Sequence, residues 1–272
     1  MSLDPAVRIV AIDWSGKLER AAEFIWLADV LEGKLVSLEN GRNREQVIDA
    51  VIAIARREPH TVVGLDFAFS FPGWWCAQQG WRETREVWGA MAIDGERLLH
   101  ACEPPFWGRR GRRNSLPRDR RYRATELDDA SGAKSVFQIG GAGAVGTGSV
   151  RGMRHLLTLA ERGFDVWPFG PQGWPRAVEI YPRVLTGPVN KSSWRRRHEF
   201  LFNRFPGQPA ALLERAAGSE DAFDAAASAL VMAEYADQLS RLVPADAPPH
   251  AIEGRIWRPL SEPTGSSSRR GE

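Results

Sequence analysis

The chain has 272 residues, 43% of them hydrophobic and 26% charged, which is enough length and apolar content for one elaborated α/β domain with a sizeable core. Its two cysteines, Cys76 and Cys102, form no C-x-x-C pair, which excludes a disulfide framework and a thiolate zinc site. The first residues lack a signal-peptide pattern, and no run approaches the ~20 apolar residues of a membrane span, so we expect a cytoplasmic protein that stays out of the membrane.

Strand and helix patterns alternate in the first quarter of the chain. Apolar and β-branched runs predict strands at Val7–Asp13, Glu23–Val30 and Lys34–Leu38, joined as an antiparallel meander. A helix is predicted at Asn43–Arg57, because an asparagine can cap its start, apolar residues recur through it and two arginines occupy its last turn. The run Thr61–Phe67 then predicts a buried strand beside the first one.

The segment from about residue 71 to residue 135 breaks this regular pattern, and we interpret it as an insertion rich in tryptophan and arginine. Aromatic rings beside arginines are typical of grooves that bind single-stranded nucleic acid, where bases stack on the rings. The alternative is that the tryptophans pack the insertion onto the domain, because tryptophan is mostly buried wherever it occurs. The five tryptophans are Trp74, Trp75, Trp81, Trp88 and Trp107.

The formal net charge of +2 conceals a strongly basic stretch at residues 108–123. This stretch holds eight arginines and a single aspartate, so the rest of the chain is net negative. Clustered arginines favour phosphate contacts, since each neutralised phosphate releases counterions, and the alternative is a solvated, mobile loop. The predicted nucleic-acid-binding residues are Arg109, Arg110, Arg112, Arg113, Arg118, Arg120, Arg121 and Arg123.

A glycine-rich loop at Ile139–Gly148 precedes a predicted helix at Ser149–Arg162. Gly141, Gly143 and Gly146 spell G-x-G-x-x-G, the dinucleotide fingerprint, but the motif lies in mid-chain and opens no β-α-β unit, so we expect no nicotinamide or flavin cofactor. The loop could instead hold a phosphate against glycine amides and the helix N-terminus, or it could be a simple tight connection. The arginines predicted to stay exposed on the helix are Arg151, Arg154 and Arg162.

Two further strands are predicted at Phe164–Phe169 and Ala177–Tyr181. The second carries Glu179 between two apolar residues, where a charge is unfavourable unless the side chain meets solvent, a metal or a partner. Glu179 is therefore a candidate acid of the site, or else an outward-facing strand residue. A helix at Trp194–Phe205 follows, with a second basic face at residues 195–197.

Four aspartates occupy positions that favour a divalent-metal site. Asp13 and Asp66 each end an apolar run, and carboxylates at the carboxyl ends of strands lie where α/β sheets bind ligands. Asp221 and Asp224 open an alanine-rich helix capped by Ser219, and their spacing puts both on one side of it. Hard cations prefer oxygen ligands of this kind. The predicted ligands of Mg²⁺ or Mn²⁺ are therefore Asp13, Asp66, Asp221 and Asp224.

The order of these elements resembles the ribonuclease H-like superfamily. AIDWSG at 11–16 is similar to its first-strand acid, GLD at 64–66 to its fourth-strand acid, and DAFDAAASA at 221–229 to the helix acids of Holliday-junction resolvases. Most of residues 7–260 resembles more closely an uncharacterised family of predicted nucleases, domain of unknown function 429. The VEIYP run at 178–182 and a terminal strand at Glu253–Pro259 carry this second resemblance.

The resemblance implies an α/β fold in which three antiparallel strands and then parallel strands form a mixed sheet flanked by helices. We expect one such domain over residues 7–260, interrupted by the insertion. The first six residues and the polar tail at 261–272 are expected to be disordered.

The same resemblance implies a nuclease. Two Mg²⁺ or Mn²⁺ ions ~4 Å apart, bridged by Asp13, would activate water and stabilise the leaving oxygen of a phosphodiester. Two alternatives stay open: an ATP-binding phosphotransferase of the actin and sugar-kinase type, and a nucleic-acid-binding module without catalysis. The predicted catalytic acids are Asp13, Asp66, Asp224, Asp221 and Glu179, and the predicted partner is DNA or RNA.

Overall fold

A computed structural model describes residues 6–128 and 132–260. The termini that we expect to be disordered, residues 1–6 and 261–272, lie outside this part except for residue 6. Across the described ranges, no helix is long and apolar enough to cross a membrane.

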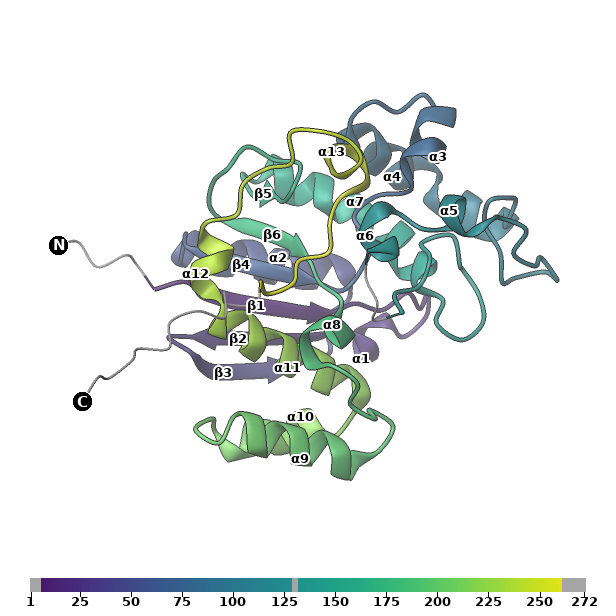
Figure 1. Cartoon of the computed structure of the whole chain (residues 1–272). Coiled ribbons are helices and arrows are strands. Elements are labelled where there is room, and N and C mark those ends of the chain that lie inside the picture. Colours follow the sequence, from purple (N-terminus) through teal and green to yellow (C-terminus); the bar gives the residue numbers. More distant parts are fainter. Residues whose placement is uncertain (1–5, 129–131, 261–272) are drawn as a thin grey trace, which may run out of the picture.

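Six strands form one mixed sheet in the order β3-β2-β1-β4-β6-β5 (Figure 1). The first three strands pair antiparallel, whereas β4 lies parallel to β1 and β6 lies parallel to β4. The predicted fold class, an α/β protein in which three antiparallel strands and then parallel strands form a mixed sheet flanked by helices, is therefore confirmed. The strands are β1 (Arg8–Asp13), β2 (Trp26–Leu31), β3 (Lys34–Glu39), β4 (Thr61–Leu65), β5 (Asp165–Val166) and β6 (Arg176–Glu179).

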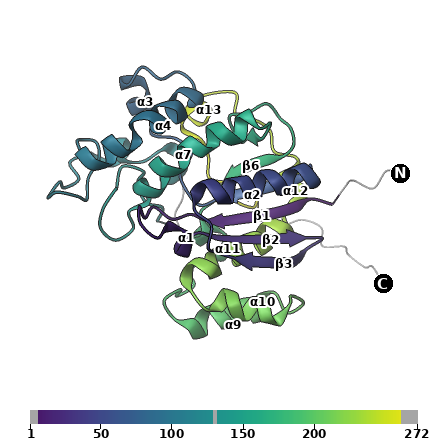
Figure 2. The same cartoon turned by 180° about the vertical axis from the view of Figure 1, so that it is seen from behind.

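Alternate residues of β1 pack on opposite faces of the sheet, as the two-residue period of a strand requires. Val10 and Ile12 belong to a buried cluster with residues of α2 (Arg44–Arg57) and α7 (Val145–Glu161). Ile9 and Ala11 belong to a second cluster, together with residues of α11 (Glu220–Glu234). Figures 1 and 2, which view the protein from opposite sides, show α11 on one face and α2 and α7 on the other.

The remaining helices are mostly short. They are α1 (Ala21–Phe24), α3 (Gly73–Gln78), α5 (Arg118–Arg121), α6 (Ala124–Leu127), α8 (Pro182–Thr186), α9 (Trp194–Arg204), α10 (Ala210–Ala217), α12 (Ala236–Ser240) and α13 (His250–Glu253). In addition, the segment interpreted as an insertion contains one long helix, α4 (Thr84–Ala101), which packs against α7. The pattern in the sequence did not indicate α4, because Gly89 and Gly95 interrupt its apolar residues and weaken its helix propensity.

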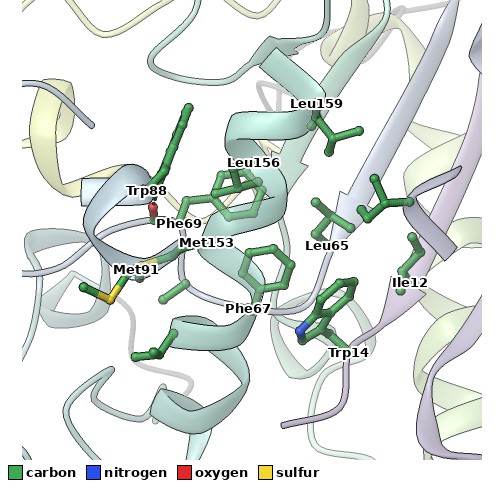
Figure 3. Close-up of a cluster of buried hydrophobic side chains, with 14 of the residues drawn as sticks. Ile12, Trp14, Leu65, Phe67, Phe69, Trp88, Met91, Met153, Leu156 and Leu159 are labelled. Atoms are coloured by element: carbon green, nitrogen blue, oxygen red, sulfur yellow. Dashed lines mark hydrogen bonds between the residues drawn. The ribbon is translucent and has the colours of Figure 1, made fainter. Parts of the chain in front are cut away.

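The tryptophans of this segment contribute to the core. Trp75 and Trp88 are buried, and Trp88 donates a hydrogen bond from its indole nitrogen to the carbonyl oxygen of Phe69 at 2.8 Å. Figure 3 shows Trp88 beside Phe69 and Met153 of α7, within one cluster that extends to Trp14. The interpretation that tryptophans pack this segment onto the sheet domain is therefore confirmed for Trp75 and Trp88.

Two predicted strands are shorter than expected or absent. Within Phe164–Phe169 only Asp165–Val166 is a strand, since Pro168 has no N–H to donate to a ladder. The predicted terminal strand at Glu253–Pro259 makes a single bridge, between Glu179 and Ile256. The N–H of Ile256 donates to the hydroxyl oxygen of Thr125 at 3.0 Å, so this C-terminal segment crosses from the sheet to the inserted segment and does not extend the ladder.

Candidate functional site

Three aspartates meet at one edge of the sheet. Asp13 is the last residue of β1 and Asp66 directly follows β4, and these parallel neighbours end side by side. Helix α11 begins at this edge, where the Ser219 hydroxyl accepts a hydrogen bond from the N–H of Ala222 at 3.0 Å. The second turn of α11 brings Asp224 to the two strand ends, and the carboxylates of Asp224 and Asp66 both act on the pKa of Asp13.

The close approach of α11 to the sheet depends on small residues. Alanines line much of the buried side of the helix, as the sequence predicted, and they keep the helix slim. On the sheet side, a Cβ added to Gly64 would lie 2.6 Å from the sulfur of Met232. Gly64 therefore lets β4 and α11 pack close enough to bring Asp66 and Asp224 together.

Burial and mutual repulsion raise the pKa values of these carboxyl groups. The pKa of Asp13 lies well above its ordinary value, because the group is buried and faces Asp224, Asp66 and Asp221. The pKa of Asp66 is raised to about 8, chiefly by burial and then by Asp224, and a hydrogen bond with Asp13 partly opposes the shift. The pKa of Asp224 is raised to about 6, chiefly by burial. The site therefore takes up protons when no other cation neutralises it.

The sequence analysis missed one charged residue of this cluster, Lys191. Its ammonium group forms an ion pair with Oδ2 of Asp224. Burial acts to lower the pKa of Lys191, but the carboxylates of Asp224, Asp66 and Asp13 outweigh it and raise the pKa. Lys191 lies in the loop between α8 and α9, where no local pattern marks it. Its place in the cluster becomes visible only in the structure, where it pairs with Asp224, 33 residues further along the chain.

Asp221 lies at the rim of the cluster. It is half-buried in the first turn of α11, and its pKa is raised by burial and by the neighbouring Glu220. It lines a hollow of about 930 Å³ together with Asp13, Lys17 and Arg109. Asp221 is thus near the three central acids but lines the hollow that also contains Asp13 and Arg109.

Glu179 is close to Asp66 but is already fully paired. It is 2% exposed, and its two carboxylate oxygens accept hydrogen bonds from the guanidinium of Arg123 and from the N–H of Phe69. The interpretation as an outward-facing strand residue is wrong, because the side chain points into this buried network. Glu179 contributes charge near the site, and its oxygens are engaged by its own partners.

The same network corrects the prediction that Arg123 binds nucleic acid. Arg123 is 1% exposed and pairs with Glu126 at 2.8 Å as well as with Glu179. Two buried carboxylates hold its guanidinium, so no donor remains for an external phosphate. Arg123 joins the inserted segment to β6.

The other arginines of the basic stretch differ in exposure. Arg109 is half-buried, donates to the carbonyl oxygen of Ile139 at 2.8 Å and lines the hollow beside Asp13. Arg121 is half-buried as well and donates to the carbonyl oxygen of Leu116 at 2.9 Å. The exposed ones are Arg110, Arg112, Arg113, Arg118 and Arg120.

The glycine loop lies beside the acids, and part of it is helical. Helix α7 begins at Val145, four residues before the predicted start, so Gly146 lies in its first turn. The N–H of Gly146 donates to the carbonyl oxygen of Gln138 at 2.9 Å, and an added Cβ would lie 2.1 Å from the carbonyl oxygen of Val136. A glycine is therefore required at position 146 because the backbone at Val136 passes too close for a larger side chain. Gly141 and Gly143 have φ values of +80° and +75°, which favour glycine.

Two arginines anchor the loop that follows Asp13. Arg44 donates to the carbonyl oxygen of Ser15 at 2.7 Å, and Arg151 donates to the carbonyl oxygen of Gly16. The prediction that Arg151 is exposed is wrong, because its guanidinium is buried between Gly16 and the carboxylate of Glu96. These contacts fix the backbone that carries Asp13.

The acids are not arranged as a ready metal site. Within residues 6–128 and 132–260, no three histidine, cysteine, aspartate or glutamate side chains are placed to hold a metal ion. Two observations nevertheless fit a hard cation. The donors are carboxylates, which Mg²⁺ and Mn²⁺ prefer, and Oδ1 of Asp224 is buried with no hydrogen-bond partner among the described residues.

Comparisons of this chain with models of protein families, with curated proteins and with solved structures find no match. Its own residues are therefore the basis for a functional proposal.

Proposed function

We propose that this protein hydrolyses phosphodiester bonds of nucleic acid with Mg²⁺ or Mn²⁺ at Asp13, Asp66 and Asp224. One observation carries the proposal. Three carboxyl groups from distant parts of the chain come together in a buried site, where burial and neighbouring charges raise their pKa values, as is typical of functional sites. An unpaired oxygen of Asp224 points to a missing partner there.

Each acid has a distinct part in the proposal. Asp13 is the central ligand because the other acids surround it, and Asp66 and Asp224 complete the ligand set. Asp221 adds negative charge from the hollow that it shares with Asp13. Bound divalent cations supply water activation and stabilisation of the charge that develops on the phosphodiester. Glu179 is left out of the set, because Arg123 holds both of its oxygens.

Nucleic acid as the substrate is supported by the basic surface. Exposed arginines between residues 110 and 120 provide phosphate contacts next to the hollow that contains Asp13 and Arg109. The mixed sheet with acids at these strand ends is also what the resemblance to the ribonuclease H-like superfamily and to domain of unknown function 429 implies. The proposal includes membership of the family called domain of unknown function 429 and a cytoplasmic location.

The test is cleavage of single-stranded, duplex and branched nucleic acid in Mg²⁺ or Mn²⁺. Asp13→Asn is expected to lower metal-dependent cleavage by about 100-fold or more, since it removes the central ligand charge. Asp49→Asn, an exposed aspartate on α2, is the matched control and should cleave like the wild type. Equal cleavage by Asp13→Asn, or no cleavage of any substrate by the wild type, contradicts the proposal.

The same assay separates the two alternatives. Salt-dependent binding that Asp13→Asn leaves unchanged, with no cleavage, would favour a binding module that relies on the exposed arginines. Calorimetric titration with ATP tests the alternative that the protein is an ATP-binding phosphotransferase. Saturable ATP binding that depends on Asp13 would favour that class.

A further inference from the structure

A second hollow lies beside the acids. It has a volume of about 450 Å³, and Asp66 and Asp224 line it together with Lys134, Arg183 and Lys191. Pockets of this size accommodate small ligands or parts of larger ones. The hollow therefore offers three cationic side chains directly beside the proposed catalytic acids.

Most of this positive charge has no partner within the protein. Lys134 and Arg183 are exposed and form no ion pair with any residue in the described ranges. Lys191 pairs with Asp224 but keeps 28% of its side chain exposed. Three cations that converge from separate segments, with only one of them paired, are suited to bind an anion that enters the hollow.

Each cation lies on a segment that packs against the rest of the protein. The side chain of Lys134 lies against the glycine loop, where a Cβ added to Gly143 would come within 3.1 Å of its Cε. Arg183 lies on α8, which packs against α11. The buried guanidinium of Arg197 donates to the backbone carbonyl of Lys191 and so anchors that loop. These contacts position the three segments that carry the cations around one hollow.

We propose that Lys134, Arg183 and Lys191 form a phosphate-binding subsite. It holds a phosphate group of a nucleic-acid strand next to the phosphodiester bond that is cleaved at Asp66 and Asp224. The choice of a nucleic-acid strand rests on the proposed function. The glycine loop acts indirectly, because Gly143 makes room for Lys134. A strand that crosses the site runs from the hollow at Asp13 and Arg109, over the acids, into this subsite.

The proposal is tested by binding of a fluorescently labelled single-stranded oligonucleotide in EDTA, where cleavage is absent. Lys134→Ala and Arg183→Ala are each expected to weaken binding about 3- to 10-fold and to reduce the salt slope by about 0.7, as for one lost phosphate contact. Arg57→Ala removes an exposed arginine of α2 that has no ion pair in the described ranges, and it is the matched control. Losses no larger than those of Arg57→Ala overturn the subsite.

Competition distinguishes a strand from a free nucleotide, since both present phosphate. A strand subsite predicts that unlabelled oligonucleotide displaces the probe at about 10-fold or more lower concentration than AMP or inorganic phosphate, because neighbouring phosphates bind together. Equal displacement by AMP overturns the assignment to a strand. Unchanged melting temperatures of the variants show that the losses are not due to unfolding.

Failure of the subsite and failure of the nuclease proposal give different results. If the wild type cleaves nucleic acid but Lys134→Ala and Arg183→Ala bind as it does, only the subsite is wrong. If these variants lose binding while the wild type never cleaves, the subsite stands and the nuclease proposal is wrong. Lys191→Met adds a check, because it should weaken binding as well while removing the ion pair with Asp224.

Discussion

The protonation of single side chains determines how the acidic cluster behaves without metal. Asp66 has a pKa raised to about 8, whereas an aspartate in the unfolded chain has a pKa of about 3.9. Between these two values the folded protein binds more protons than the unfolded chain does. Stability that this group contributes is therefore complete below the unfolded pKa and is lost as the pH rises through the folded one.

We therefore predict that, in EDTA, the free energy of unfolding falls as the pH rises from about 5 to about 9. Asp66→Asn cannot ionise and should show a smaller fall, so that it becomes relatively more stable at the alkaline end. Melting temperatures across the pH range measure this, with Asp49→Asn as the control. A wild-type curve parallel to that of Asp66→Asn would argue against the raised pKa.

A cation should reverse this loss. We predict that Mg²⁺ or Mn²⁺ raises the melting temperature more at about pH 8 than at about pH 5, because the ionised acids bind the metal and the protonated acids do not. Asp224→Asn should lose most of the shift, whereas Asp49→Asn should keep it. A shift of the same size at both pH values, or none at either, contradicts metal binding at these acids.

The sequence was sufficient to predict where Asp13 and Asp66 lie, but not that Lys191 lies beside them. Asp13 and Asp66 end apolar strand runs, so local pattern alone places them at one sheet edge. Lys191 lies in a loop whose position depends on the packing of α8 against α11, and loop residues carry no periodic signal. The pairing of Glu179 with Arg123 was equally hidden, because the two residues lie 56 positions apart in the chain.

Helix packing determines whether the acids can approach one another. Helix α11 packs directly over β1 and β2, and Gly64 of β4 provides the space for Met232 on that helix. A methyl group there would push the helix away from the strand or force the methionine into another rotamer. The geometry of the site thus depends on a residue that carries no functional group.

We predict that Gly64→Ala lowers the free energy of unfolding by about 1–3 kcal/mol through overpacking. It should also lower activity more than its stability loss explains, since Asp224 moves with α11. Gly89→Ala is the matched control, because nothing lies within 4 Å of its added Cβ and alanine in a helix stabilises by roughly 0.5–1 kcal/mol. Denaturant titration of both variants gives the two values, and a Gly64→Ala protein as stable as the wild type would exclude overpacking.

The elements predicted from sequence are those with a strong local pattern. Helix α2 begins at the expected cap, where the Asn43 side chain accepts from the N–H of Gln46 at 2.9 Å. Helix α4 was missed because Gly95, which interrupts its pattern, is needed for contact with Val150 of α7. Helix α7 starts early for a similar reason, since close packing requires the glycines of its first turns. Tertiary contacts override propensity at these positions.

A buried ion network joins the parts of the protein to one another. Arg123 connects the inserted segment to Glu179 of β6, and it also donates to the carbonyl oxygen of Glu253 at 3.0 Å. The carboxylate of Glu253 in turn accepts from the N–H groups of Gly73 and Ala124. The sheet, the inserted segment and the C-terminal segment therefore share one set of buried charges.

We predict that Arg123→Met destabilises the protein by about 3–5 kcal/mol, because it leaves two buried carboxylates without their counter-charge. Arg113→Met, an exposed residue of the same basic stretch, should change stability by no more than about 0.5 kcal/mol. Chemical denaturation measures both. Similar losses for the two variants would mean that the network is not a stabilising link.

The chain positions of the acids also determine when the site can exist during synthesis. Asp13 and the basic stretch leave the ribosome early, whereas Asp224 belongs to a helix made near the end of translation. Until α11 docks, one face of β1 lacks its cover and the acidic cluster lacks a ligand. A nascent chain therefore presents the exposed arginines of the basic stretch before the acidic cluster is complete.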